Sequence, residues 1–103
     1  MKIPKEFYIK GKLWTVEYKW RLEEPGIGKC DGLCDFTLRV IYLDRLISKE
    51  DKVRVFLHEY THALIHEAHL HEAGGIDGIL EEVLCESVAD GILENFILKW
   101  KRK

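Results

Sequence analysis

The chain has 103 residues, of which 47% are hydrophobic and 33% charged, and its formal net charge is −2. This length predicts one domain over residues 1–103, and the hydrophobic content argues against a disordered chain. Without a strong basic surface, nucleic-acid binding is disfavoured as the main activity, and no apolar run is long enough to span a membrane. The first residues lack the apolar segment of a secretory signal, so we expect a cytoplasmic protein.

The first half of the chain predicts β-strands. Two runs, residues 6–10 and 13–20, flank a plausible tight turn at Gly11-Lys12, and a loop follows over residues 23–28. Shorter strands are expected from Gly32 to Asp35 and from Arg39 to Leu43. Alternation in the second run gives it one apolar face, formed by Trp14, Val16, Tyr18 and Trp20.

The second half predicts two helices. Ser48 is the expected N-cap of a helix that runs to about Leu70, before Gly74-Gly75. A second helix begins near Asp77 or Ile79 and runs towards Lys99. Its apolar residues recur every three or four positions, which predicts one packed face: Ile79, Leu80, Val83, Leu84, Val88, Ile92 and Phe96. Strands followed by helices indicate an α+β fold, with a small twisted sheet of three to four strands packed on both helices.

The first helix contains the motif HExxH, with His58, Glu59 and His62. Residues four apart lie on one helix face, so both imidazoles can reach one Zn²⁺ ion. Glu59 flanks that face, where it can meet a metal-bound water without binding the metal. The alternative is a pair of solvent-facing histidines on an amphipathic helix.

A catalytic zinc ion needs a third protein ligand, and the second helix offers several acidic residues. The candidates are Glu81, Glu82, Glu86, Asp90 and Glu94, of which Glu82, Glu86 and Asp90 are spaced four apart and line one edge of the apolar face. Spacing alone does not choose among them, and each could be a surface carboxylate. The three cysteines, Cys30, Cys34 and Cys85, are odd in number, which argues against a disulfide scaffold. The chain has no Gln and one Asn, beside abundant Glu and Lys, as thermophile proteins tend to have.

His58-Glu59-xx-His62, followed by a later helix with Glu86-Ser87-Val88-Ala89-Asp90, resembles the gluzincin zinc metallopeptidases. In that family a glutamate on a downstream helix is the third ligand, and an Asp four residues later orients a ligand histidine. The resemblance therefore implies Glu86 as the third zinc ligand and Asp90 as the residue that orients a histidine, most plausibly His58. The whole chain also looks like the minimal members called minigluzincins.

Gly32-Leu33-Cys34-Asp35 loosely matches the strand before the active-site helix of the ImmA/IrrE-type peptidases, which the chain also resembles. The resemblance implies hydrolysis of a peptide or protein substrate by a zinc-bound water that Glu59 activates. We expect the substrate to add a strand along Gly32, Leu33, Cys34 and Asp35. The larger gluzincins supply an oxyanion-stabilising His or Tyr from a second subdomain, which this chain lacks.

The resemblance leaves two questions of function open. One alternative is a zinc-binding domain with a regulatory or partner-binding role and no catalysis. The other question is latency, because an exposed edge strand beside a reactive site would engage neighbouring chains. We expect a zymogen-like intact chain, its cleft covered by the residues after Phe96, with Trp100 as the anchor, or by a second protomer in a homodimer.

Overall fold

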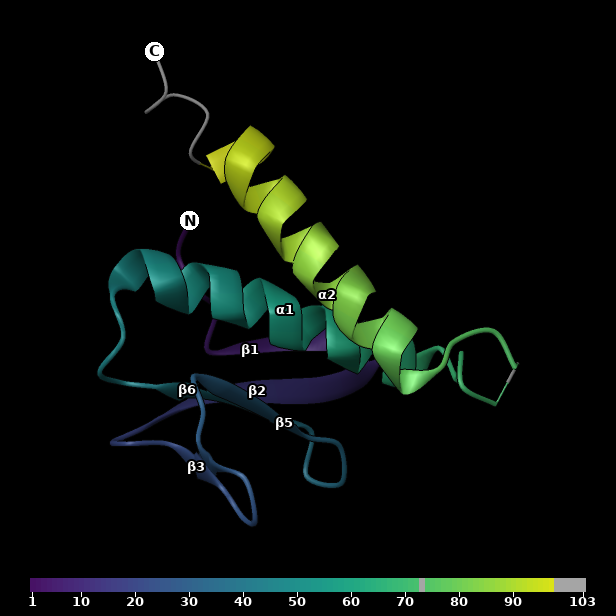
Figure 1. Cartoon of the computed structure of the whole chain (residues 1–103), viewed down its shortest axis with the longest axis horizontal. Coiled ribbons are helices and arrows are strands. Elements are labelled where there is room, and N and C mark those ends of the chain that lie inside the picture. The colour runs from purple at the N-terminus through teal and green to yellow at the C-terminus, as the bar shows by residue number, and fades with distance from the viewer. Residues whose placement is uncertain (73, 98–103) are drawn as a thin grey trace.

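The computed structural model describes residues 1–72 and 74–97, and it confirms the α+β fold (Figure 1). The predicted strands and helices are all present, although the helices end earlier than expected, and two short strands, β3 and β4, form around the loop predicted over residues 23–28. The elements are, in chain order, β1 (Glu6–Ile9), β2 (Lys12–Lys19), β3 (Glu23–Glu24), β4 (Gly28–Lys29), β5 (Gly32–Asp35), β6 (Val40–Asp44), α1 (Lys49–Glu67), α2 (Gly78–Ile92) and the π-helical turn η1 (Leu93–Ile97).

Four strands form one mixed sheet in the order β1-β2-β6-β5, and β3 pairs with β4 in a separate small ribbon. β1 and β2 are antiparallel, β2 and β6 are parallel, and β5 is antiparallel to β6. The turn between β1 and β2 is at Lys10-Gly11, one residue before the predicted position. Both of these residues have positive φ, as a two-residue hairpin turn requires. In the order β1-β2-β6-β5, strand β5 is last and lies at one edge of the sheet.

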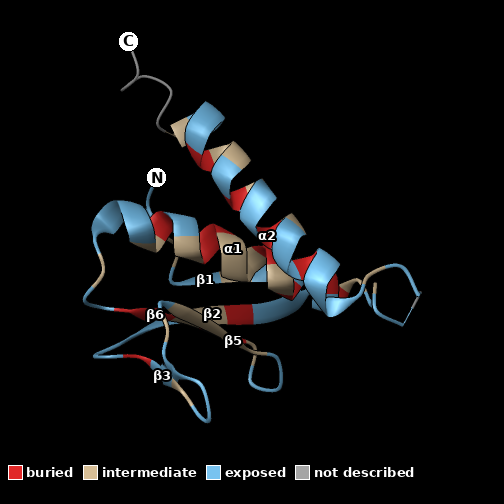
Figure 2. Cartoon of the chain, viewed as in Figure 1, coloured by how far each residue is buried: buried red, intermediate tan, exposed pale blue. Residues whose placement is uncertain are grey.

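α1 packs on one face of the sheet, and α2 crosses α1 (Figure 1). The Ser48 side chain caps α1 as predicted, accepting a hydrogen bond from Asp51 N at 3.1 Å. Helix α1 is buried on more than one side, since it contacts both the sheet and α2 (Figure 2). The centre of the core contains the largest fully buried apolar side chains, Trp14, Ile41, Leu43 and Cys85.

Two predicted apolar faces are only partly buried. In β2, Trp14 is buried, but Trp20, just after the strand, is 67% exposed. In α2 the expected packed face is half-buried at Leu84, Val88 and Ile92 but exposed at its ends, and the helix turns Glu81, Cys85 and Ala89 furthest towards the interior. Small side chains let two helices lie close together, which explains why Cys85 and Ala89 lie inward.

The ends of the helices also differ from the prediction. α1 ends at Glu67, and α2 gives way to η1 after Ile92, so the regular α-helix stops short of Lys99. The proposed blocking tail after Phe96 includes Trp100 and lies outside the described residues, apart from Ile97.

Candidate metal centre

His58 and His62 lie one turn apart on the side of α1 that faces α2. Their side chains are only 14% and 13% exposed, and their Nε2 atoms lie 3.1 Å apart. Two nitrogen ligands of one tetrahedral zinc ion, each about 2.0–2.1 Å from the metal, are themselves about 3.3 Å apart. The two rings therefore converge at the separation that a shared metal ion requires.

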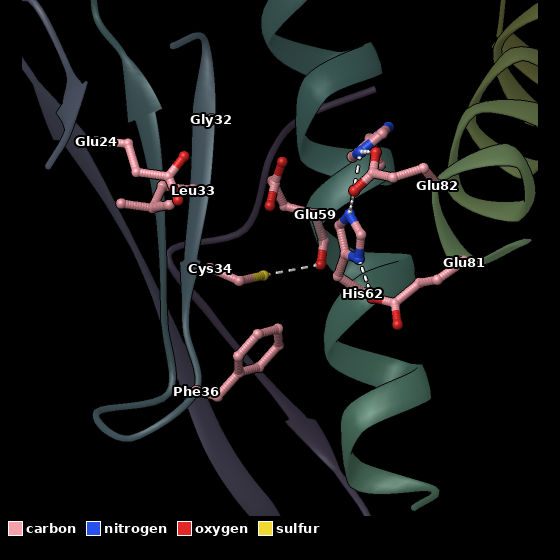
Figure 3. Close-up of a pocket in the computed structure, with 10 residues that line it drawn as sticks. Glu24, Gly32, Leu33, Cys34, Phe36, Glu59, His62, Glu81 and Glu82 are labelled. Carbon is pink, nitrogen blue, oxygen red and sulfur yellow. Dashed lines mark hydrogen bonds and ion pairs between the residues drawn. The ribbon is translucent and has the colours of Figure 1, made fainter. Parts of the chain in front are cut away.

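Glu82, from the second turn of α2, closes the same group. Its Oε1 atom lies 3.0 Å from Nε2 of His62, and its Oε2 atom lies 3.3 Å from Nε2 of His58 (Figure 3). Each distance, from one oxygen to one histidine, is close to the separation of about 3.3 Å between two ligand atoms of a tetrahedral zinc ion. Two imidazoles and one carboxylate are the ligands of many catalytic zinc sites, so this set of donors fits zinc.

The other nitrogen of each histidine also meets a carboxylate. Glu86 Oε1 lies 2.5 Å from Nδ1 of His58, although without hydrogen-bond geometry, and Nδ1 has no hydrogen-bond partner among residues 1–72 and 74–97. Nδ1 of His62 contacts Oε2 of Glu81. A carboxylate at Nδ1 favours a proton on that atom and leaves the Nε2 lone pair for a metal.

Each position predicted for Glu86 or Asp90 is taken by the residue one helical turn earlier. Glu82 lies where Glu86 is expected, and Glu86 lies where Asp90 is expected. Glu86 contacts the Nδ1 side of His58, whereas Glu82 lies at the Nε2 atoms. The Asp90 side chain is 60% exposed and lies 3.8 Å from Arg54 rather than beside a histidine. The reason is the crossing of the helices, which brings the early part of α2 closest to the histidines, and sequence spacing does not reveal that crossing point.

Cys85 is a further candidate ligand. Its thiol is buried, and one ligand atom from each of His58, His62 and Cys85 lies within 4.8 Å of the others, so this cluster could hold a metal ion. Burial, together with nearby glutamates, raises the pKa of the Cys85 thiol to about 12. The thiol is therefore protonated near neutral pH and is a poor ligand until a metal displaces its proton.

Glu59 faces a cavity of about 380 Å³ that His58, His62 and Glu82 also line (Figure 3). Burial raises the pKa of the Glu59 carboxyl, and the two nearby histidines oppose that rise. A second cavity of about 250 Å³ continues past Glu59 towards Arg54. A groove thus runs along both sides of Glu59.

Strand β5 forms the opposite wall of this groove (Figure 3). A Cβ atom at Gly32 would lie 2.4 Å from a methyl carbon of Val55 and 3.1 Å from Cγ of Glu59, so only glycine allows this close approach. Cys34 Sγ contacts the Glu59 carbonyl oxygen at 3.1 Å, and the Asp35 carboxylate accepts hydrogen bonds from the next turn. The role of Gly32–Asp35 in binding substrate stays a prediction.

The sequence assigns no role to Glu81 or to His71. Glu81 precedes Glu82, and its inward position follows from the orientation of α2. His71 contacts Glu81 from the connection between the helices, and no local sequence signal reveals that contact. The other histidines outside the motif have different neighbours, since His66 stacks on Phe36 and His69 pairs with Glu72.

Within residues 1–72 and 74–97, no helix combines the length and apolar character needed to cross a membrane. A scan against models of known protein families and a search of curated proteins both find no match.

Proposed function

We propose that the chain is a zinc-dependent metallopeptidase with His58, His62 and Glu82 as metal ligands and Glu59 as the catalytic residue. One observation carries the proposal: the two Nε2 atoms lie 3.1 Å apart and each has one oxygen of Glu82 within 3.3 Å, beside a half-buried glutamate in a groove. Glu82 replaces the Glu86 of the sequence-based assignment, because its oxygens lie at the Nε2 atoms. The resemblance to gluzincins supports the same chemistry.

When bound, zinc would supply Lewis-acid chemistry, making a water more acidic and polarising a substrate carbonyl. Glu59 would take the proton from the attacking water and deliver it to the leaving amine. Its raised pKa suits both steps, because a carboxyl group that is too acidic cannot return the proton. The free edge of β5 would hold the peptide backbone in an extended conformation by adding it to the sheet as a strand.

Glu59→Gln tests the proposal against the alternative of a zinc-binding domain without catalysis. The amide keeps the size of the side chain but cannot accept the proton, so we expect full zinc content and loss of peptide hydrolysis. Zinc content is measured by elemental analysis, and hydrolysis by mass spectrometry of a peptide-library digest. Glu50→Gln, on the exposed first turn of α1, is the matched control and should leave both unchanged. A zinc-loaded wild-type chain that cleaves no peptide, including after deletion of Ile97 to Lys103, would favour the alternative.

Cys85 gives the alternative a specific form, a metal bound by His58, His62 and a thiolate. We favour Glu82 because one of its oxygens lies within 3.3 Å of each Nε2 atom, and because the Cys85 thiol, whose pKa is raised to about 12, must lose a proton before it can bind a metal. Latency of the intact chain, through its tail or through a homodimer, stays part of the proposal. The position of β5 at the edge of the sheet is the reason to expect it.

A further inference from the structure

His71 lies in the connection between α1 and α2, and both of its ring nitrogens are engaged. Nδ1 donates to the carbonyl oxygen of Ile76 at 2.8 Å, and Nε2 contacts Oε1 of Glu81. Its side chain therefore connects the segment before α2 to the first turn of α2.

Glu81 carries this connection to the metal centre. Its side chain is only 11% exposed, and its second oxygen, Oε2, contacts Nδ1 of His62. One carboxylate thus lies between two imidazoles, that of His71 and that of a proposed metal ligand. With one oxygen held by His71, the other has a restricted position relative to the His62 ring.

We propose that His71 is a positioning residue for the metal centre, which acts through Glu81 to fix the orientation of His62. The inference rests on the proposed function for the identity of the metal ligands. The neighbouring His69 does not share this role, because its Nδ1 atom pairs with Glu72 at 3.3 Å rather than with Glu81. The chain thus offers a matched control two residues away.

The contacts also couple the connection between the helices to metal binding. If His71 strengthens metal binding by a given factor, then bound metal strengthens the His71 contacts by the same factor. Backbone hydrogen bonds at Gly74 and Gly75 close this connection as turns, so its opening can be followed by cleavage. Zinc should therefore slow limited proteolysis of the connection in the wild type, and by a smaller factor without His71.

The central experiment compares the zinc dissociation constants of His71→Asn and His69→Asn, by competition with a chromophoric chelator. Asn is used at both positions because His69 has a φ of 55°, which asparagine tolerates. We expect zinc affinity to fall by up to about tenfold in His71→Asn, at the lower end of losses for groups behind a ligand histidine. His69→Asn should bind zinc like the wild type. His71→Gln, which keeps a donor towards Glu81, should recover part of the loss.

A double-mutant cycle tests whether His71 acts through Glu81. His71→Asn should weaken zinc binding in the wild type but have no further effect in a Glu81→Ala background. The Co²⁺ absorption spectrum should change in His71→Asn and stay the same in His69→Asn. Unchanged zinc affinity in folded His71→Asn, or an equal loss in both backgrounds, would overturn the inference. None of these measurements needs hydrolysis, so a chain that binds zinc without cleaving peptides refutes the proposed function and leaves this inference standing.

Discussion

Each histidine of the candidate metal centre meets one carboxylate at Nε2 and another at Nδ1. Glu82 lies at both Nε2 atoms, while Glu86 and Glu81 lie at the Nδ1 atoms of His58 and His62. The two positions have different consequences for a metal. A carboxylate at Nε2 is placed to bind the ion, whereas a carboxylate at Nδ1 orients the ring and increases its basicity.

This difference predicts a graded response to alanine substitution along α2. Glu82→Ala removes a proposed ligand and should abolish stoichiometric zinc binding. Glu86→Ala removes only the carboxylate beside His58 Nδ1 and should weaken zinc binding by about 10- to 100-fold. Asp90→Ala, at a 60% exposed side chain beside Arg54, should leave zinc affinity unchanged. Isothermal titration with zinc measures all three.

The competing assignment makes the opposite prediction for these variants. If Glu86 is the ligand and Asp90 orients His58, as the gluzincin spacing implies, Glu86→Ala loses zinc, Asp90→Ala weakens its binding and Glu82→Ala keeps it. Cys85→Ser is the control for the cluster that includes the thiol, and retention of zinc there supports a carboxylate as the third ligand.

At the scale of elements, a buried ionic contact fixes the C-terminal end of α1 to the sheet. Glu67 is buried and accepts a hydrogen bond from Trp14 Nε1 at 2.9 Å and another from Arg39 Nε at 2.8 Å. Burial alone would raise the pKa of this carboxyl, but the hydrogen bonds from Arg39 and Trp14 outweigh it and lower the pKa to about 2.

The lowered pKa of Glu67 predicts acid sensitivity with a definite sign. The folded pKa is below the unfolded value of about 4.3, so the stabilisation is fully present above about pH 4.3 and is lost as the pH falls towards 2. We expect Glu67→Gln to lower the free energy of unfolding by about 3 kcal/mol at neutral pH and by much less near pH 2. Urea unfolding at the two pH values measures this. A difference that is the same at both would contradict the ionic origin.

The elements themselves could largely be predicted from the sequence, because local signals define them. Ser48 marks the start of α1, and the strand alternation and the turn near Gly11 define the first hairpin. The packing of α2 could not be predicted in the same way. Its face rich in large apolar residues is only partly buried, with Ile79 exposed, whereas Cys85 and Ala89 face inward.

The orientation of α2 also determines which part of the site could be predicted from the sequence. The HExxH histidines lie together because the spacing within one helix fixes them. The choice among Glu82, Glu86 and Asp90 depends on where α2 crosses α1, which is a tertiary contact. The contact of His71 with Glu81 depends in addition on the path of the connection, which no helical or strand period describes.

At the scale of the whole molecule, α2 packs mainly on α1, and its C-terminal end projects away from the sheet (Figure 1). Several of its apolar side chains are exposed, including Ile79 at 81% and Val83 at 58%. These side chains add little to the hydrophobic contribution that holds α2 in place, which comes instead from residues such as Cys85 and Ala89. The ligands of the proposed metal centre, His58 and His62 on α1 and Glu82 on α2, connect these two helices.

Removal of the metal should therefore loosen α2 more than the sheet. A ligand present at about 100 times its Kd stabilises the form that binds it by about 2.7 kcal/mol, which corresponds to about a 100-fold change in an opening equilibrium. We expect amides of α2 to exchange with solvent up to that much faster after chelation, because opening α2 breaks the site, whereas β2 and β6 change little. Hydrogen–deuterium exchange with and without zinc measures this, and Glu82→Ala, already without metal, should show fast exchange in both conditions. Equal effects on α2 and the sheet would mean that metal binding couples only to global unfolding.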